Sequence, residues 1–279
     1  GCGRMWNLAN DGHAEMTISV WNLDGSTYVP YGNPELSHND CWDADGLQIE
    51  VGRPTELVHT KFAGSVLVLE DPRAMQDPGK AFRQSPKQPL MLNLHHEGVG
   101  PFYGHVGDPD DENQFARAHT EQHMRVSGEL KLGDQPAVAF NGHGVRDHSW
   151  GPRFWQATPS YRWITGNFGD DLGIVIQANG AGKGRGLFQE GDAIVRITKA
   201  RIETEYEPGT RYHRSLRAEL ELEDGRERLL EGKVMGFIPL RNRRSGANTH
   251  IGEGMTEYTL DGQRVGYGLS EYLDQPEES

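Results

Sequence analysis

Short segments of alternating apolar and polar residues recur along most of the chain, and Asp-Gly pairs separate several of them. Alternation places successive side chains on opposite faces of a strand, and Asp-Gly is a favoured turn between two antiparallel strands. The segment "MTISVWNLDGSTYVPYG" shows both features around Asp24-Gly25. Further Asp-Gly pairs stand at 45–46, 224–225 and 261–262. Helical periodicity is scarce, although the irregular stretch 71–89 has room for a short helix. The pattern predicts an all-β chain of antiparallel strands.

A seven-residue pattern occurs twice, as "GHGVRDH" at 142–148 and "GYGLSEY" at 266–272. Chance can produce a match over so short a window, but a hairpin-like segment precedes each copy and favours a duplicated unit. We therefore expect two barrel-like halves, 1–157 and 158–279, that meet near residues 150–160.

Composition narrows the classes of partner. The formal net charge of −13 argues against nucleic acid or an anionic membrane surface as the main partner. No apolar run approaches the ~20 residues of a membrane helix, and two cysteines cannot form a disulfide framework. The glycine-rich "GAGKGRG" lacks phosphate-loop spacing, and no Gly-x-Ser-x-Gly elbow occurs. We expect a cytoplasmic protein without an integral membrane segment, a nucleotide or another cofactor. The first residue is Gly rather than Met, which leaves room for a missing leader, and the oligomeric state stays open.

The stretch "NGHGVRDHSWGPRFW", residues 141–155, concentrates groups that can carry chemistry. If it is extended, His143 and Asp147 share one face, while His148 and Trp150 lie on the other. A carboxyl group among aromatic side chains is desolvated, which raises its pKa and keeps a proton for general-acid catalysis. Alternatively, Asp147 is a structural corner residue that pairs with a neighbouring arginine.

The same stretch resembles the Gly-x-Gly-x-x-Asp-His-x-Trp-Gly signature of carotenoid 1,2-hydratases, also called hydroxyneurosporene synthases. Their superfamily has two tandem lipocalin-like (calycin) β-barrels and includes Diels–Alderase-like and terpene-cyclase proteins. The resemblance implies that fold here, with Asp147 as the proton donor to an isoprenoid alkene. Val145-Arg146 departs from the hydratases, which more often carry an aromatic residue and His there.

Further residues are candidates for the same site. His143 and His148 could orient Asp147 and relay protons, and aromatic faces could stabilise a carbocation. The candidate aromatic residues are Tyr103, Trp150, Phe154 and Trp155.

Two other groups of side chains could take part. His95, His96 and Glu97, with His105 and His123, could bind a metal. However, adjacent histidines on a strand face opposite sides, so a polar lining supplied by His95 or Glu97 is favoured over a metal.

Glu253 and Glu257 share one strand face, and Glu271 matches Asp147 in the repeat. Such carboxylates could share a proton, or they could simply belong to a solvated face and pair with arginines.

Three functions remain open. The first is a cofactor-independent hydratase, cyclase or isomerase, of the lyase or isomerase class, that protonates an apolar terpenoid or polycyclic substrate in a barrel cavity. The second is a carrier that binds a hydrophobic ligand, such as a lipid or isoprenoid, without chemistry. The third is a scaffold domain whose pocket is vestigial.

Overall fold

Antiparallel strands make up nearly all of the regular structure, which confirms the all-β prediction. The computed structural model describes residues 2–8, 12–22, 24–36, 42–106, 116–153, 158–244 and 247–275. The strands are β1 (Cys2–Leu8), β2 (His13–Trp21), β3 (Thr27–Val29), β4 (Tyr31–Gly32), β5 (Trp42–Ala44), β6 (Leu47–Arg53), β7 (Leu57–Leu69), β8 (Lys87–Gly98), β9 (Tyr103–Val106), β10 (Ala116–Leu132), β11 (Val138–Arg153), β12 (Ser160–Asn167), β13 (Leu172–Asn179), β14 (Lys183–Glu190), β15 (Ala193–Tyr206), β16 (His213–Leu222), β17 (Glu227–Arg244), β18 (Ala247–Leu260) and β19 (Arg264–Asp274).

The irregular stretch 71–89 holds a 3-10 turn, η2 (Pro72–Gln76), and a short helix, α1 (Pro78–Gln84). Each begins with a proline that follows an aspartate. The carboxylates of Asp71 and Asp77 accept hydrogen bonds from the backbone N–H groups of Arg73 and Lys80. Proline fixes a helical φ at the first position, and the aspartate satisfies an N–H group that has no partner within the helix.

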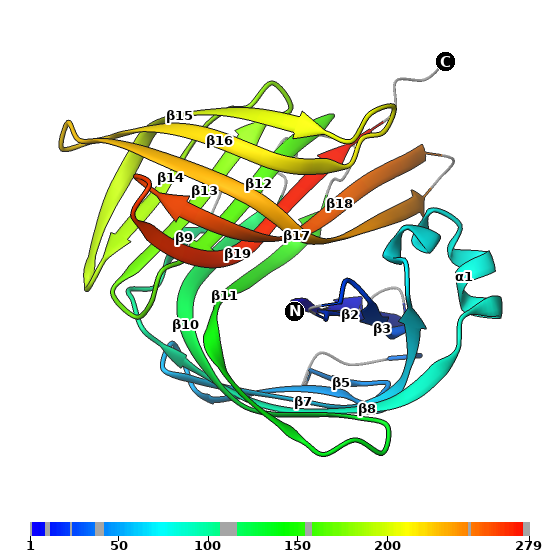
Figure 1. Cartoon of the computed structure of the whole chain (residues 1–279). Helices are drawn as coiled ribbons and strands as arrows, with labels where there is room; N and C mark the ends of the chain where they lie inside the picture. The colour runs from blue at the N-terminus through cyan, green and yellow to red at the C-terminus, as the bar shows by residue number, and fades with distance from the viewer. Residues whose placement is uncertain are drawn as a thin grey trace. The chain divides into compact units, whose positions relative to one another are not determined.

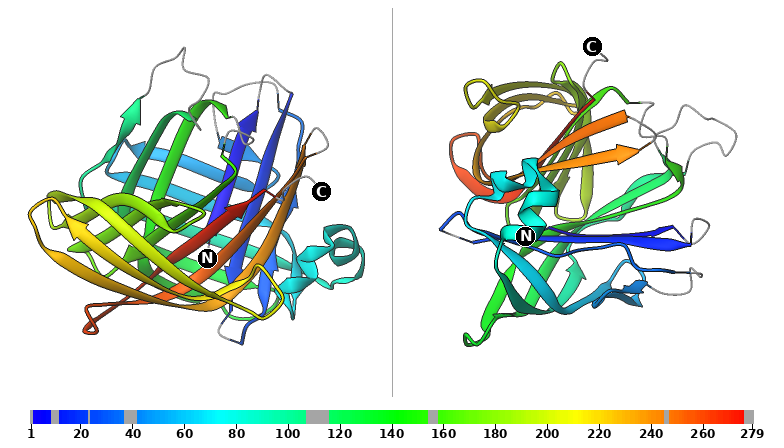
Figure 2. Two further views of the ribbon diagram at one scale, coloured as in Figure 1. Left: turned by 90° about the horizontal axis from the view of Figure 1, so that it is seen from above. Right: turned by 90° about the vertical axis from the view of Figure 1, so that its right-hand side faces the viewer.

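Strands β12 to β19 form a closed antiparallel barrel in which each strand pairs with its neighbours in the sequence (Figure 1). The last strand closes it against the first, with Ile164 opposite Ser270. Figure 2 shows the closed ring from two further directions. Alternate residues point inward and form the core of this barrel, as expected for eight strands whose side chains fill the interior. The core includes Ile164, Ile174, Ile176, Phe188, Ile197, Leu220 and Tyr258.

The other strands form one sheet in the order β1-β2-β3-β7-β8-β10-β11, with β4, β5, β6 and β9 paired along its sides. Its core gathers alternate apolar residues of β2, β7 and β8 around Met16, Phe62 and Leu90. The two copies of the sequence repeat lie in β11 and β19, which end the strand order of the sheet and of the barrel.

The chain divides into two compact units. Unit 1 comprises residues 1–98 and 125–142, and unit 2 comprises 99–124 and 143–279. Unit 2 therefore contains the barrel together with β9, the first part of β10 and the last part of β11. The division at 157–158 drawn from the repeat stays a prediction, and the barrel's first strand begins at Ser160.

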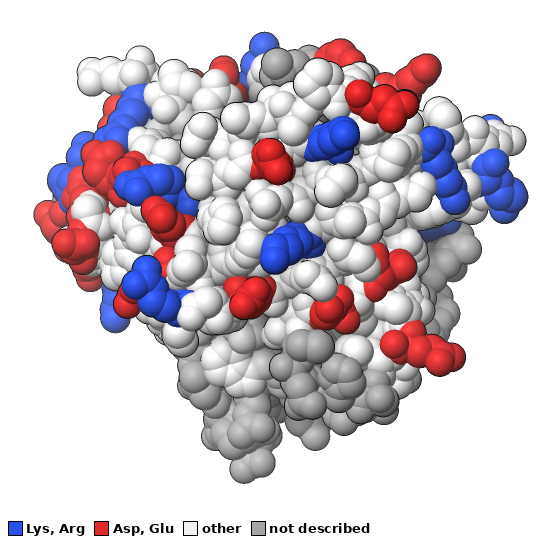
Figure 3. Space-filling view, turned by 90° about the horizontal axis from the view of Figure 1, so that it is seen from below, with Lys and Arg blue, Asp and Glu red and all other residues white. Residues whose placement is uncertain are grey.

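Two further observations concern the surface and the helices. On the face drawn in Figure 3, Lys and Arg side chains are interspersed with Asp and Glu. Across the described ranges, the helical segments are too short and too polar to cross a membrane.

Candidate active site

Within unit 2, β9, β10 and β11 lie against the outer wall of the barrel. The side chains of Glu121 and His123 on β10 reach barrel residues, because alternate positions of a strand share a face. The indole Nε1 of Trp163 donates to Glu121 Oε1 over 2.8 Å. Nδ1 of His123 lies 2.7 Å from Oδ1 of Asn167. These contacts hold β10 in place and aim its polar side chains at the wall.

Three side chains come together here, and we call His119, Glu121 and Asp147 the acid cluster. His119 Nε2 lies 3.0 Å from Asp147 Oδ2 and 3.9 Å from Glu121 Oε1. His119 and Glu121 are two residues apart on β10, whereas Asp147 comes from β11. The cluster therefore depends on how these strands are placed and not on one local motif.

Glu121 has the environment of a general acid. Burial raises the pKa of its carboxyl group to about 7, and the Asp147 carboxylate acts in the same direction. His119 and the Trp163 hydrogen bond oppose this rise only in part. A carboxyl group with this pKa is protonated in a substantial fraction of molecules near neutral pH and can give up its proton.

Tyr103 lies directly opposite Glu121 in the pairing of β9 with β10. Its hydroxyl group is buried and has no hydrogen-bond partner among the described residues. Burial, together with the Glu121 and Asp147 carboxylates, raises the pKa of this phenol. Tyr103 therefore remains a neutral O–H donor beside the acid cluster.

The exposed fraction of the side chain decreases from Asp147 through His119 to Glu121. The side chain of Asp147 is 36% exposed, that of His119 is 16% exposed and that of Glu121 is 7% exposed. The imidazole thus stands between a carboxylate in contact with water and a carboxyl group shielded from it. Such an order suits the transfer of protons between solvent and a buried acid.

His123 fixes β10 against the barrel and does not belong to the acid cluster. Burial lowers its pKa to about 4, so the ring is neutral near pH 7. Gly173 of β13 makes room for the ring, because a Cβ at that position would lie 2.3 Å from His123 Nε2.

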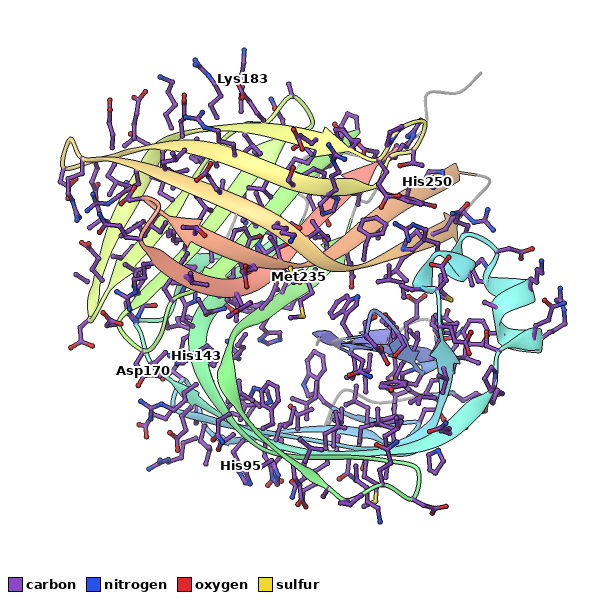
Figure 4. The ribbon with its side chains drawn as sticks, viewed as in Figure 1. His95, His143, Asp170, Lys183, Met235 and His250 are labelled. Atoms are coloured by element: carbon purple, nitrogen blue, oxygen red, sulfur yellow. The ribbon has the colours of Figure 1, made fainter. Side chains whose placement is uncertain are left out.

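The residues predicted around Asp147 are distributed over both faces of β11. Asp147 belongs to the acid cluster, but its side chain is the exposed member, and the buried, high-pKa environment expected for it belongs to Glu121. His143 Nε2 lies 2.7 Å from Asp170 Oδ1, and Figure 4 shows both side chains. His148 and Trp150 face the other way, with their rings 5.2 Å apart. Phe154 and Trp155 lie outside the described residues.

The remaining predicted residues have other partners. In unit 1, His95 stacks on His59 with ring centroids 4.1 Å apart, and Glu97 pairs with Arg125 at 3.3 Å. In the barrel, Tyr267 donates to Glu257 over 2.9 Å, and the Tyr161 hydroxyl donates to the buried Glu271.

Glu271 also lies opposite Glu253 in the β18–β19 register, and both are buried.

Sequence reasoning missed His119 and Glu121. The pattern "HTEQH" at 119–123 does carry a signal, since it places His, Glu and His on one face of a strand. What the pattern could not supply was the partner strand that brings Asp147 to the same place.

The acid cluster also has a composition that metal ions accept, since one ligand atom from each side chain lies within 4.8 Å of the others. However, Nε2 of His119 already contacts Asp147, and Oε1 of Glu121 accepts the Trp163 indole. An ion would have to displace the contact between His119 and Asp147. We therefore interpret the cluster as a group that handles protons.

The fold and the site define an all-β protein with a lipocalin-like barrel and a buried acid on its outer wall. A family model described as "Domain of unknown function (DUF7064)" matches residues 1–276, so the chain belongs to this family. Comparison with curated proteins finds no match.

A solved structure shares the fold, and two others resemble the chain less strongly. The structure of CghA with Sch210972 aligns with a TM-score of 0.51 and 12% identity, covering 94% of this chain and 79% of that one. CghA alone gives 0.49 and 11%, covering 96% and 80%. A protein assigned as AttH from Nitrosomonas europaea gives 0.49 and 14%, covering 97% and 89%.

Proposed function

We propose that this protein is a cofactor-independent enzyme that protonates an apolar small molecule, and that Glu121 holds the transferred proton. The observation that carries the proposal is the buried Glu121 carboxyl group, with a pKa raised to about 7, beside the more exposed pair of His119 and Asp147. The substrate class remains the one expected from the sequence, a terpenoid or polycyclic molecule with an alkene or conjugated carbonyl group.

In the proposed reaction, the π electrons of the substrate take the proton from neutral Glu121, which leaves a carbocation and a Glu121 carboxylate. The Trp163 N–H group already donates to this carboxyl group and stabilises the carboxylate. The cation then loses a proton, after isomerisation or ring closure, or it adds water and loses a proton in a hydration. The aromatic rings of Tyr103 and Trp163 favour a cation without capturing it.

His119 returns the proton to Glu121 in this scheme. The Asp147 carboxylate, 3.0 Å from His119, stabilises the imidazolium while the proton is held there. Asp147 thereby relays protons rather than donating directly to the substrate, because it is the exposed member of the acid cluster. His143, paired with Asp170, supports the position of β11 and takes no part in the transfer.

The similarity to CghA supports a ligand-binding fold, since CghA has a structure with Sch210972. A carrier without chemistry is the alternative, and the two functions differ in whether Glu121 exchanges its proton with a bound molecule.

The test incubates the protein in D2O with a panel of linear polyenes and polycyclic terpenoids. Mass spectrometry then measures deuterium incorporated at carbon. We expect Glu121→Gln to reduce incorporation on the order of 10²-fold or more, the usual scale of general-acid catalysis. Asp147→Asn should reduce it less, and Glu97→Gln, an exposed carboxylate of unit 1, should leave it unchanged. Full incorporation by Glu121→Gln with complete loss in Asp147→Asn would make Asp147 the donor. Ligand binding without incorporation in any variant would establish a carrier.

A further inference from the structure

A second cluster lies on the opposite face of β11, and it consists of Phe102, Arg146, His148 and Trp150. Arg146, His148 and Trp150 alternate with Asp147 and Ser149, so their side chains point away from the acid cluster. The guanidinium carbon of Arg146 lies 5.8 Å from the centre of the Phe102 ring. The ring of His148 is 5.2 Å from that of Trp150. All four residues belong to unit 2.

Arg146 is a cation whose hydrogen bonding is incomplete. Its Nη2 contacts His148 Nδ1 at 3.2 Å, whereas its Nη1 is buried and has no hydrogen-bond partner among the described residues. Burial lowers the pKa of this guanidinium and, with the nearby Arg146 charge, also lowers the pKa of His148. His148 is therefore neutral and accepts the Arg146 N–H, so it supplies no negative charge. A buried donor on a charged group is costly to leave unpaired.

The two large aromatic side chains of this cluster are exposed to solvent, although Arg146 itself is half-buried. Phe102 and Trp150 are each 45% exposed, which is high for such large apolar side chains. The Arg146 guanidinium has an unpaired N–H group, the exposed Phe102 ring on one side and His148 on the other, with the exposed Trp150 ring next to His148. This row of side chains fits a ligand with one negative charge and an apolar body. A polyanion such as a nucleic acid fits poorly, since the chain carries a net charge of −13.

We propose that Arg146 binds the carboxylate of an apolar molecule, with Phe102 and Trp150 contacting its hydrocarbon part. The guanidinium of Arg146 donates to the carboxylate oxygens, and the aromatic rings bury the adjoining carbon atoms. This site is separate from the acid cluster, so it does not depend on the proposed function.

The experiment uses 4-phenylbutyrate as the probe and 4-phenylbutan-1-ol as its uncharged match, with dissociation constants from calorimetry. We expect the acid to bind the unaltered protein at least roughly tenfold more tightly than the alcohol, as charge-assisted hydrogen bonds warrant. Arg146→Gln should reduce the affinity for the acid to that for the alcohol. Arg125→Gln, which alters an exposed arginine paired with Glu97, should bind both probes as the unaltered protein does.

Several outcomes would overturn the proposal. Equal binding of acid and alcohol by the unaltered protein would do so, as would unchanged affinity in Arg146→Gln. Displacement of the probe by inorganic phosphate at equal concentration would show a general anion site instead. If Arg146→Gln does not fold, the proposal is tested by NMR of the unaltered protein and by binding to Arg146→Lys. Addition of 4-phenylbutyrate must then shift the Arg146 Nε–H and Trp150 indole signals, and Arg146→Lys must bind the acid less tightly.

Discussion

Two carboxyl groups on neighbouring strands show how surroundings assign different tasks to the same chemical group. Glu121 is shielded from water by the barrel wall and holds a proton near neutral pH. Asp147 is more exposed and contacts an imidazole. Paired groups whose surroundings differ in this way commonly divide acid and base roles in enzymes. The protonation of Glu121 is therefore the property on which the proposed function depends.

The protonation state of Glu121 is directly measurable. A difference infrared spectrum between the unaltered protein and Glu121→Gln should contain a protonated carboxyl band that disappears with a midpoint near pH 7. The isosteric Glu97→Gln variant is the matched control, because it alters a carboxyl group that lies on the surface beside Arg125. A Glu121 band that has vanished by pH 5 would contradict the general-acid role.

Metal content tests the interpretation of the acid cluster. We expect purified protein to hold much less than one equivalent of zinc, manganese or iron, because binding would displace the contact between His119 and Asp147. Mass spectrometry of the elements measures this, with and without prior exposure to a chelator. One equivalent of metal that is lost in His119→Ala would show that the cluster is a metal centre.

At the scale of elements, β10 positions the site by packing two of its side chains against the barrel. Trp163 of β12 fixes Glu121, and Gly173 of β13 admits His123. The contacts that place the acid therefore come from two barrel strands, β12 and β13, and the shape of the barrel wall matters as much as the polar groups do.

Gly173→Ala should destabilise the protein by about 1–3 kcal/mol, the usual range for overpacking a buried site. The added Cβ would push His123 away from Asn167, where its Nδ1 now lies 2.7 Å from the amide oxygen. Urea unfolding measures the change. Gly79→Ala is the matched control, since a Cβ there meets side-chain atoms only at 3.4 Å and beyond, and helix propensity favours alanine. His123→Ala in the Gly173→Ala background should recover part of the loss, and no recovery would contradict this account.

The sequence predicted the elements better than it predicted the site. The Asp-Gly turns are local, and Asp45, Gly46, Asp261 and Gly262 all have the positive φ values that such turns require. The pairing of Asp147 with His119 spans 28 positions, and that of Trp163 with Glu121 spans 42. Alternation predicted which face of β11 holds Asp147. It could not show that the buried carboxyl group with a raised pKa would be that of Glu121 on β10.

At the scale of the whole molecule, four buried groups make the stability of the fold depend on pH. Three histidines act in one direction and Glu121 acts in the other. Burial lowers the pKa of His96 and His123 to about 4 and that of His213 to about 3, whereas it raises that of Glu121 to about 7. The histidines contribute stability that is present above the unfolded-state pKa of 6.5 and is lost as the pH falls toward 4 and 3. Glu121 contributes stability that is present below its unfolded-state pKa of 4.5 and is lost as the pH rises to about 7.

Between pH 4.5 and 6.5 the effect of the three histidines is larger than that of Glu121. Together, these four groups bind about two more protons in the unfolded state than in the folded state. The free energy of unfolding should therefore rise with pH in this window, by up to roughly 3 kcal/mol per pH unit. Urea unfolding at several pH values measures the slope. Glu121→Gln should make the slope steeper, because it removes the one group that acts in the opposite direction. A slope that stays the same in this variant would mean that Glu121 is ionised in the folded state.

Closure of the barrel has a consequence for biosynthesis. The Tyr161 hydroxyl on β12 meets Glu271 on β19 across 110 positions of the chain. While the ribosome is still making the intervening strands, β12 presents an open edge that can pair with other nascent chains. The barrel can close only after β19 has left the exit tunnel, so this part of the fold forms late and slowly, as topologies with distant pairings do. Molecular chaperones that shield exposed strand edges should therefore bind the nascent chain from the time β12 leaves the ribosome until β19 has also left it.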